Sequence, residues 1–104
     1  MPSQLVVHEK AVDELGNTIE KKIWKVPVSE NFPHGYKYSL AYIVHGKRVV
    51  GYDNAERKGD HKHIGGREYV YKVKSLRRLV RDFQKDVDRY RERHYEGEKS
   101  SDRY

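Results

Sequence analysis

Two histidines separated by one residue, His61 and His63, are the side chains of this sequence best suited to acid–base chemistry. Histidine exchanges a proton near neutral pH, and in an extended segment residues two apart project to the same side. Two neighbouring imidazoles can therefore share acid–base duty on one substrate. Asp53 ends the apolar segment that precedes them, and we expect it to orient one of the two rings.

The same residue types also bind metal ions. Two imidazoles and a carboxylate, from Asp53 or Asp60, form a permitted site. The sequence has no cysteine, which excludes thiolate zinc sites and disulfides. Because no spacing fixes the third ligand, we expect no metal and no cofactor, with a metal-dependent nuclease as an alternative. A purely structural interpretation also stays open, in which Asp53 and Asn54 end a strand and the histidines are exposed beside Asp60.

Cations surround the histidine pair, and they predict phosphate binding. Arginine offers a fork that fits two phosphate oxygens, and lysine offers a point charge. The net charge of the chain is +6, and its excess lies within residues 21–83. A basic surface favours a polyanion, with RNA as the first candidate partner. The predicted nucleic-acid contacts are Arg57, Lys58, Lys62 and Arg67.

RNA cleavage without a metal requires few groups: a base for the 2′-hydroxyl, an acid for the leaving oxygen, and cations for the phosphate. All of these types are present between residues 53 and 67. The leading hypothesis is therefore a metal-independent endoribonuclease with His61, His63 and Asp53 at its centre. The alternative is a non-catalytic module that binds nucleic acid or protein through the same basic segment.

The segments around these residues predict an antiparallel sheet. Apolar and polar residues alternate over 5–12, 19–28, 36–45, 48–53 and 69–73, which is typical of strands. Gly16-Asn17 is a turn signal, and as the centre of a two-residue turn it places Val26 opposite Val7. The residues between the last two strands then form one long polar loop, where function is often located.

A helix follows the sheet in the sequence. Ser75 is a favourable N-cap, and the apolar residues after it recur at helical spacing as far as Tyr90. We therefore predict an α+β fold: an antiparallel sheet of four to five strands with one long C-terminal helix packed on one face. The single domain spans residues 1–94, and the polar tail, 95–104, is expected to fray. Ile23 and Ile43 are expected on the open sheet face, where they predict a partner surface, with a homodimer as one candidate.

The segment from Val50 to Asn54, followed by Asp60-His61-Lys62-His63 and the helix over 75–87, resembles the TumE-like toxins. These are small proteins usually encoded beside a helix-turn-helix antitoxin in bacterial and archaeal type II toxin–antitoxin modules. The resemblance covers residues 32–87 and is carried mainly by the Tyr-Asp-Asn and His-Lys-His motifs. It implies a toxin that interferes with translation, as an RNase would, and that a cognate antitoxin protein neutralises.

No run of the sequence approaches the length of a membrane span, and the N-terminus lacks the apolar core of a signal peptide. We therefore expect a soluble, cytoplasmic protein with no membrane partner.

Overall fold

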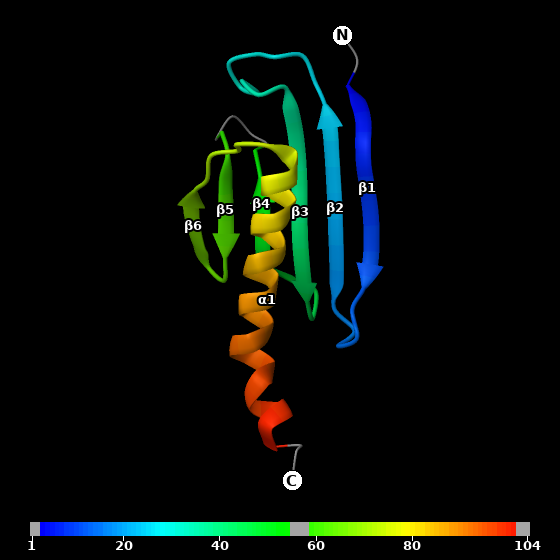
Figure 1. Ribbon diagram of the computed structural model, residues 1–104, viewed down its shortest axis with the longest axis vertical. Coiled ribbons are helices and arrows are strands. Elements are labelled where there is room, and N and C mark those ends of the chain that lie inside the picture. Colours follow the sequence, from blue (N-terminus) through cyan, green and yellow to red (C-terminus); the bar gives the residue numbers. More distant parts are fainter. Residues whose placement is uncertain (1–2, 55–58, 102–104) are drawn as a thin grey trace.

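Six antiparallel strands follow one another across a single sheet in chain order, and one helix packs on one face of it (Figure 1). The computed structural model describes residues 3–54 and 59–101. The elements are β1 (Gln4–Val12), β2 (Thr18–Lys25), β3 (Tyr36–Val44), β4 (Lys47–Asp53), β5 (His61–Ile64), β6 (Arg67–Val70) and α1 (Leu76–Ser101). The α+β class is confirmed, but the sheet has six strands in place of the expected four or five.

The extra strand comes from the segment that was expected to be one long loop. β5 and β6 form a hairpin around Gly65-Gly66, and the Gly65 amide donates to the Val49 carbonyl at 2.8 Å. Each of these strands has four residues, too few for a clear alternation of apolar and polar side chains. β6 also ends at Val70, before the expected strand end at residue 73.

The first hairpin has a different register from the predicted one. Asp13 Oδ1 accepts hydrogen bonds from the amides of Leu15 (2.9 Å) and Asn17 (3.0 Å), so the side chain closes a longer turn than a two-residue one. Val7 consequently pairs with Ile23 and not with Val26.

This register shift changes the face on which β2 residues lie. Ile23 is 1% exposed and belongs to the core, so its placement on the open face was wrong. Ile23 and its partner Tyr38 both point to the core. Trp24 and its partner Lys37 come next in their strands, and because side chains alternate along a strand, both lie on the open face. The apolar partner surface that Ile23 and Ile43 were predicted to form therefore loses one of its two residues.

The helix follows the predicted pattern. Ser75 Oγ accepts from the Arg78 amide at 3.1 Å, which confirms the N-cap. α1 crosses the sheet in front of β4 and projects beyond the ends of the strands (Figure 1). It runs to Ser101, past the end expected near His94, and fraying of the tail stays a prediction. The fully buried core residues of the sheet and helix are Ile23, Tyr38, Leu40, Tyr42, Val50, Tyr52, Leu79, Phe83 and Val87.

Within the part of the chain that the structure describes, no helix combines the length and apolar character needed to cross a membrane.

Phe83, like Leu79 and Val87, is a fully buried residue of α1 that packs into the core, and truncating it should destabilise the protein. Its side chain is fully buried and meets Tyr52 edge-to-face with ring centroids 5.8 Å apart. Phe83→Ala is expected to lower the free energy of unfolding by about 3–5 kcal/mol, measured by urea denaturation. Arg81→Ala, on the exposed side of the same helix, should change it by less than about 0.5 kcal/mol. An unchanged urea midpoint for Phe83→Ala would contradict this packing.

Candidate active site

The pairing of β4 with β5 brings the three predicted catalytic residues together on the open face of the sheet. Asp53 lies opposite His61, and Gly51 lies opposite His63. One nitrogen or oxygen atom from each of Asp53, His61 and His63 lies within 4.8 Å of the others. We call this group, together with Arg48, the β4–β5 cluster.

His61 is the buried member of the cluster, with an exposed fraction of 5%. Its Nε2 lies 3.0 Å from Asp53 Oδ1, and its Nδ1 lies 2.9 Å from the Gly59 carbonyl oxygen. A carboxylate and a carbonyl oxygen can only accept, so each of these two hydrogen bonds requires a proton on the ring nitrogen that makes it. Neither ring nitrogen of His61 is left over for a substrate in this arrangement.

His63 is the more accessible histidine. Its ring stands edge-on to the His61 ring, with centroids 5.1 Å apart, and its Nε2 lies 3.6 Å from Glu68 Oε1. Partial burial lowers the pKa of His63, and the positive charge of Arg48 lowers it further, against the opposing effect of Glu68. A lowered pKa leaves the ring neutral near pH 7, as a proton acceptor must be.

Arg48 is the member of the cluster that the sequence interpretation missed. Its Nη1 lies 3.1 Å from Asp53 Oδ2, so the guanidinium and His61 contact opposite oxygens of one carboxylate. Its side chain runs directly over Gly51, where a Cβ atom would lie 2.7 Å from the Arg48 Cδ and Nε atoms. The missing side chain of Gly51 therefore provides the space that the Arg48 side chain occupies.

A β-bulge directs Arg48 to the open face. Tyr42 pairs with Val50, whereas the next residue of β3, Ile43, pairs with Arg48, so Val49 is an extra residue in β4. Without the bulge, Arg48 and Val50 would share a face, and Arg48 would point to the core. A glycine within an apolar strand indicates a β-bulge or a close approach of another group to the backbone. Gly51 is therefore the residue from which the position of Arg48 could have been predicted.

The cations expected to bind phosphate are divided by the sheet. Lys62 lies on the helix face, where its Nζ is 3.0 Å from Asp86 Oδ2. Arg67 pairs with Ile64 on that same face and lines a pocket beside α1. The structure thus separates both residues from the β4–β5 cluster. Arg57 and Lys58 lie outside the described residues.

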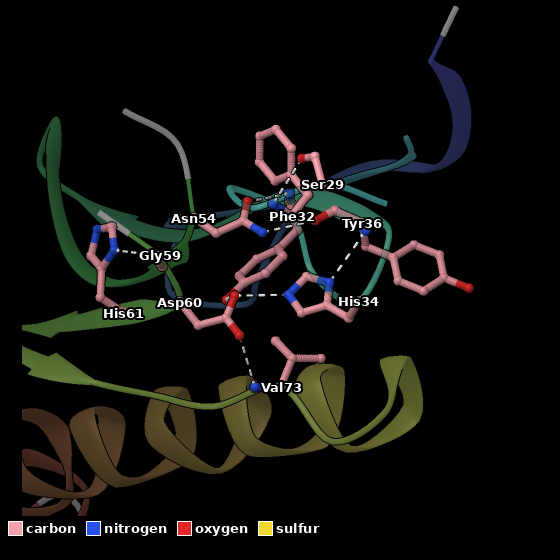
Figure 2. A network of polar contacts seen from close by, with 10 residues as sticks. Ser29, Phe32, His34, Tyr36, Asn54, Gly59, Asp60, His61 and Val73 are labelled. Carbon is pink, nitrogen blue, oxygen red and sulfur yellow. Dashed lines mark hydrogen bonds and ion pairs between the residues drawn. The ribbon is translucent and has the colours of Figure 1, made fainter. Parts of the chain in front are cut away.

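Asp60, which was considered as a metal ligand, connects β3 and the segment before α1 through its hydrogen bonds. Its Oδ1 contacts His34 Nε2 (2.9 Å) and accepts from the Tyr38 hydroxyl (3.0 Å), and its Oδ2 accepts from the Val73 amide (3.0 Å). Burial alone would raise the pKa of Asp60, but these hydrogen bonds outweigh it and hold the pKa below its usual value. Figure 2 shows the carboxylate turned toward His34 and Val73, away from the His61 ring.

Each residue of the Tyr-Asp-Asn motif has a different environment. The Tyr52 hydroxyl donates to Asp86 in the core, and Asp53 faces the β4–β5 cluster. Asn54 is 1% exposed and bridges to β3, where its Oδ1 accepts from the Tyr38 amide and its Nδ2 donates to the Tyr36 carbonyl (Figure 2). The motif therefore anchors the end of β4 on both sides of the one residue that belongs to the cluster.

The convergence of Asp53, His61 and His63 also fits a metal ion of the two-histidine, one-carboxylate type. Asp53 supplies the third ligand that the sequence could not fix. The Arg48 guanidinium is already paired with that carboxylate, however, and its positive charge would oppose a divalent cation beside it.

The electrostatic environment of His63 can be tested directly. In an NMR titration, the pKa of His63 should lie below the usual value of about 6.5. Arg48→Gln removes a charge that lowers this pKa and should raise it, whereas Glu68→Gln removes the opposing charge and should lower it further. If neither substitution changes the pKa of His63, then neither charge acts on the ring.

Comparison with known proteins identifies a family to which the chain is similar. The chain matches the family model described as Toxin TumE over residues 2–91, which covers most of its length and all six strands. Comparisons with curated proteins and with solved structures give no match.

Proposed function

The chain belongs to the TumE toxin family, and from that premise we propose that it is a toxin that cleaves RNA without a metal ion and so inhibits translation. A toxin of this family implies an antitoxin partner. We further propose that the antitoxin is a helix-turn-helix protein and that the toxin acts on RNA in the cytoplasm.

The observation that carries this proposal is the juxtaposition of Arg48 and His63 on the open face. Arg48 supplies a fixed positive charge, held at Asp53 and seated over Gly51. His63 supplies an imidazole whose pKa is lowered by partial burial and by that same charge. A neutral base and a preorganised cation are two of the three groups that cleavage of an RNA phosphodiester requires, and water can serve as the third, the acid for the leaving oxygen.

In the proposed reaction, His63 takes the proton of the 2′-hydroxyl, and the 2′-oxygen attacks the adjacent phosphorus. The guanidinium of Arg48 stabilises the negative charge that builds on the phosphate oxygens. As the 2′-oxygen–phosphorus bond forms, the bond to the 5′-oxygen breaks, and that oxygen takes a proton from water. The hydroxide left by this water is neutralised by the proton on His63. The products are a 2′,3′-cyclic phosphate and a 5′-hydroxyl.

We assign His61 and Asp53 to positioning. His61 holds one carboxylate oxygen of Asp53, and Asp53 holds Arg48 with the other. His61 and His63 were expected to share acid–base duty, but both nitrogens of His61 are engaged, so in this scheme water protonates the leaving oxygen. Arg57 and Lys58 stay candidates for phosphate contacts along the rest of the RNA.

The proposal is tested with purified protein and a single-stranded RNA in EDTA. Cleavage with 2′,3′-cyclic phosphate ends is expected, together with growth inhibition on expression that the cognate antitoxin relieves. Intact RNA under these conditions, with toxicity retained in cells, would reject metal-independent cleavage.

A metal-dependent nuclease is the second candidate, favoured by the convergence of Asp53, His61 and His63 within 4.8 Å. It predicts that EDTA abolishes cleavage and that one divalent ion restores it. Binding of that ion should then be lost in His61→Ala and in His63→Ala, as measured by calorimetry.

A further inference from the structure

The open face of the sheet continues beyond the β4–β5 cluster into β3 and β2. Asp53 pairs with Ser39, and Ser39 pairs with Lys22, so these three residues form one row across the strands. Neighbouring strands lie about 4.8 Å apart, which places Lys22 about 10 Å from Asp53. Trp24 and Lys37 pair in the next row along the same face.

Small side chains lie between these residues and the cluster. Ser39 and Ala41, the open-face residues of β3 opposite Asp53 and Gly51, have the small side chains of serine and alanine. Farther from the cluster lie two larger side chains, Trp24 and Lys37, with the Lys37 Nζ over the Trp24 ring at 5.7 Å from its centroid. Two small side chains therefore separate the Trp24–Lys37 pair from the β4–β5 cluster on this face.

The charge of this part of the open face is positive. The open-face residues of β1, β2 and β3 follow from the pairing register and include three lysines, Lys10, Lys22 and Lys37, against one acid, Glu20. Glu20 itself lies 3.7 Å from Lys22. An excess of cations next to a partly exposed tryptophan matches the two parts of a nucleotide, the phosphate and the base.

We propose that the surface formed by Lys22, Trp24 and Lys37 binds single-stranded RNA next to the cleaved phosphate. One base stacks on Trp24, and flanking phosphates contact Lys22 and Lys37. The strand must be unpaired, because a base within a duplex cannot turn its face to a side chain on a sheet. This inference rests on the proposed RNA cleavage, which places the cleaved phosphate at the β4–β5 cluster. The experiments below distinguish failure of this surface from failure of the proposed function.

Trp24 is the only tryptophan in the chain, so its fluorescence reports on this surface alone. The His63→Asn variant, which should bind RNA without cutting it, is titrated with a ten-nucleotide RNA while anisotropy follows binding. We expect quenching of Trp24 that saturates together with the anisotropy and weakens as salt is added. Trp24→Ala should raise the Kd by about 5- to 150-fold, the usual value of one stacked base.

The charge requirement has a matched control on the same strand. Lys22→Glu and Lys37→Glu should each weaken binding and flatten its dependence on salt. Lys25→Glu makes the same change on the opposite, helix-side face of β2 and should leave binding close to that of the parent. Equal effects of Lys22→Glu and Lys25→Glu would overturn the proposed surface.

Cleavage assays separate this inference from the proposed function. With the active protein, Lys22→Glu and Trp24→Ala should slow cleavage of the ten-nucleotide RNA but not of a dinucleotide, which is too short to reach Trp24. If RNA is cleaved and bound without quenching Trp24, the surface is wrong and the function stands. If RNA quenches Trp24 but is never cleaved, the surface stands and the function falls. Absence of RNA binding by anisotropy overturns the surface outright.

Discussion

Replacing His63 by asparagine is expected to slow RNA cleavage by about 10²–10⁴-fold, the usual contribution of a positioned general base. Among the residues that the structure describes, His63 is the imidazole of the cluster whose two ring nitrogens are not both engaged, and the Arg48 charge helps to keep it neutral. The rate of the parent protein should rise with pH as His63 loses its proton. The midpoint of that rise should lie below 6.5, because the pKa of His63 is lowered.

The same substitution at His45 provides the control. His45 lies exposed in the β3–β4 turn with a positive φ of 51°, a conformation that asparagine tolerates. His45→Asn should therefore leave both cleavage and stability near the parent values. Single-turnover cleavage rates and thermal unfolding are measured on all variants. A folded His63→Asn protein that cleaves at the parent rate would place the base elsewhere.

His61 separates catalysis from positioning. Because His61 is buried and bonds both Asp53 and the Gly59 carbonyl, His61→Asn should lower stability as well as activity. His63 is partly exposed, so His63→Asn should reduce the cleavage rate strongly with little loss of stability, whereas His61→Asn should reduce both.

The helix and the histidine pair could be predicted from the sequence because their signals are local. Ser75 and the apolar stripe through Phe83 depend only on spacing along one element, and the structure follows them. His61 and His63 share a face in β5 because residues two apart in any strand do so. Asp53 joins them through the pairing of β4 with β5, a strand in the segment that was expected to be a loop.

The predictions that failed depended on register, which single side chains and single inserted residues control. Asp13 lengthens the first turn by accepting two amide hydrogen bonds. The pairing register then shifts by an odd number of residues, from Val26 to Ile23 opposite Val7, and so Ile23 points to the core. The extra residue Val49 has the reverse consequence for Arg48, which it turns out of the core toward Asp53. Neither event changes the apolar pattern from which strand faces are inferred, so the cation of the candidate site was missed.

Replacing Gly51 by alanine is expected to reduce cleavage by about 10²–10³-fold while leaving the fold as stable as before or slightly more so. The new Cβ would meet the Arg48 Cδ and Nε atoms at 2.7 Å, and Arg48, a flexible side chain, would move aside. The loss then resembles removal of one preorganised group that stabilises the transition state. Gly51 has no positive φ, so alanine carries no backbone strain, and it removes conformational freedom from the unfolded chain.

The β5–β6 turn offers the matched substitution. Gly66 also has no positive φ, and a Cβ there would lie within 4 Å of no atom of the described residues apart from its chain neighbours, so Gly66→Ala should preserve both activity and stability. Displacing Arg48 should also raise the pKa of His63, since the charge that helps to lower it moves away. Gly51→Ala should therefore shift the pH midpoint of cleavage upward as well as reducing the plateau rate. Full activity in Gly51→Ala would mean that the position of Arg48 over the strand is not required, and the metal-free mechanism would lose its phosphate-binding cation.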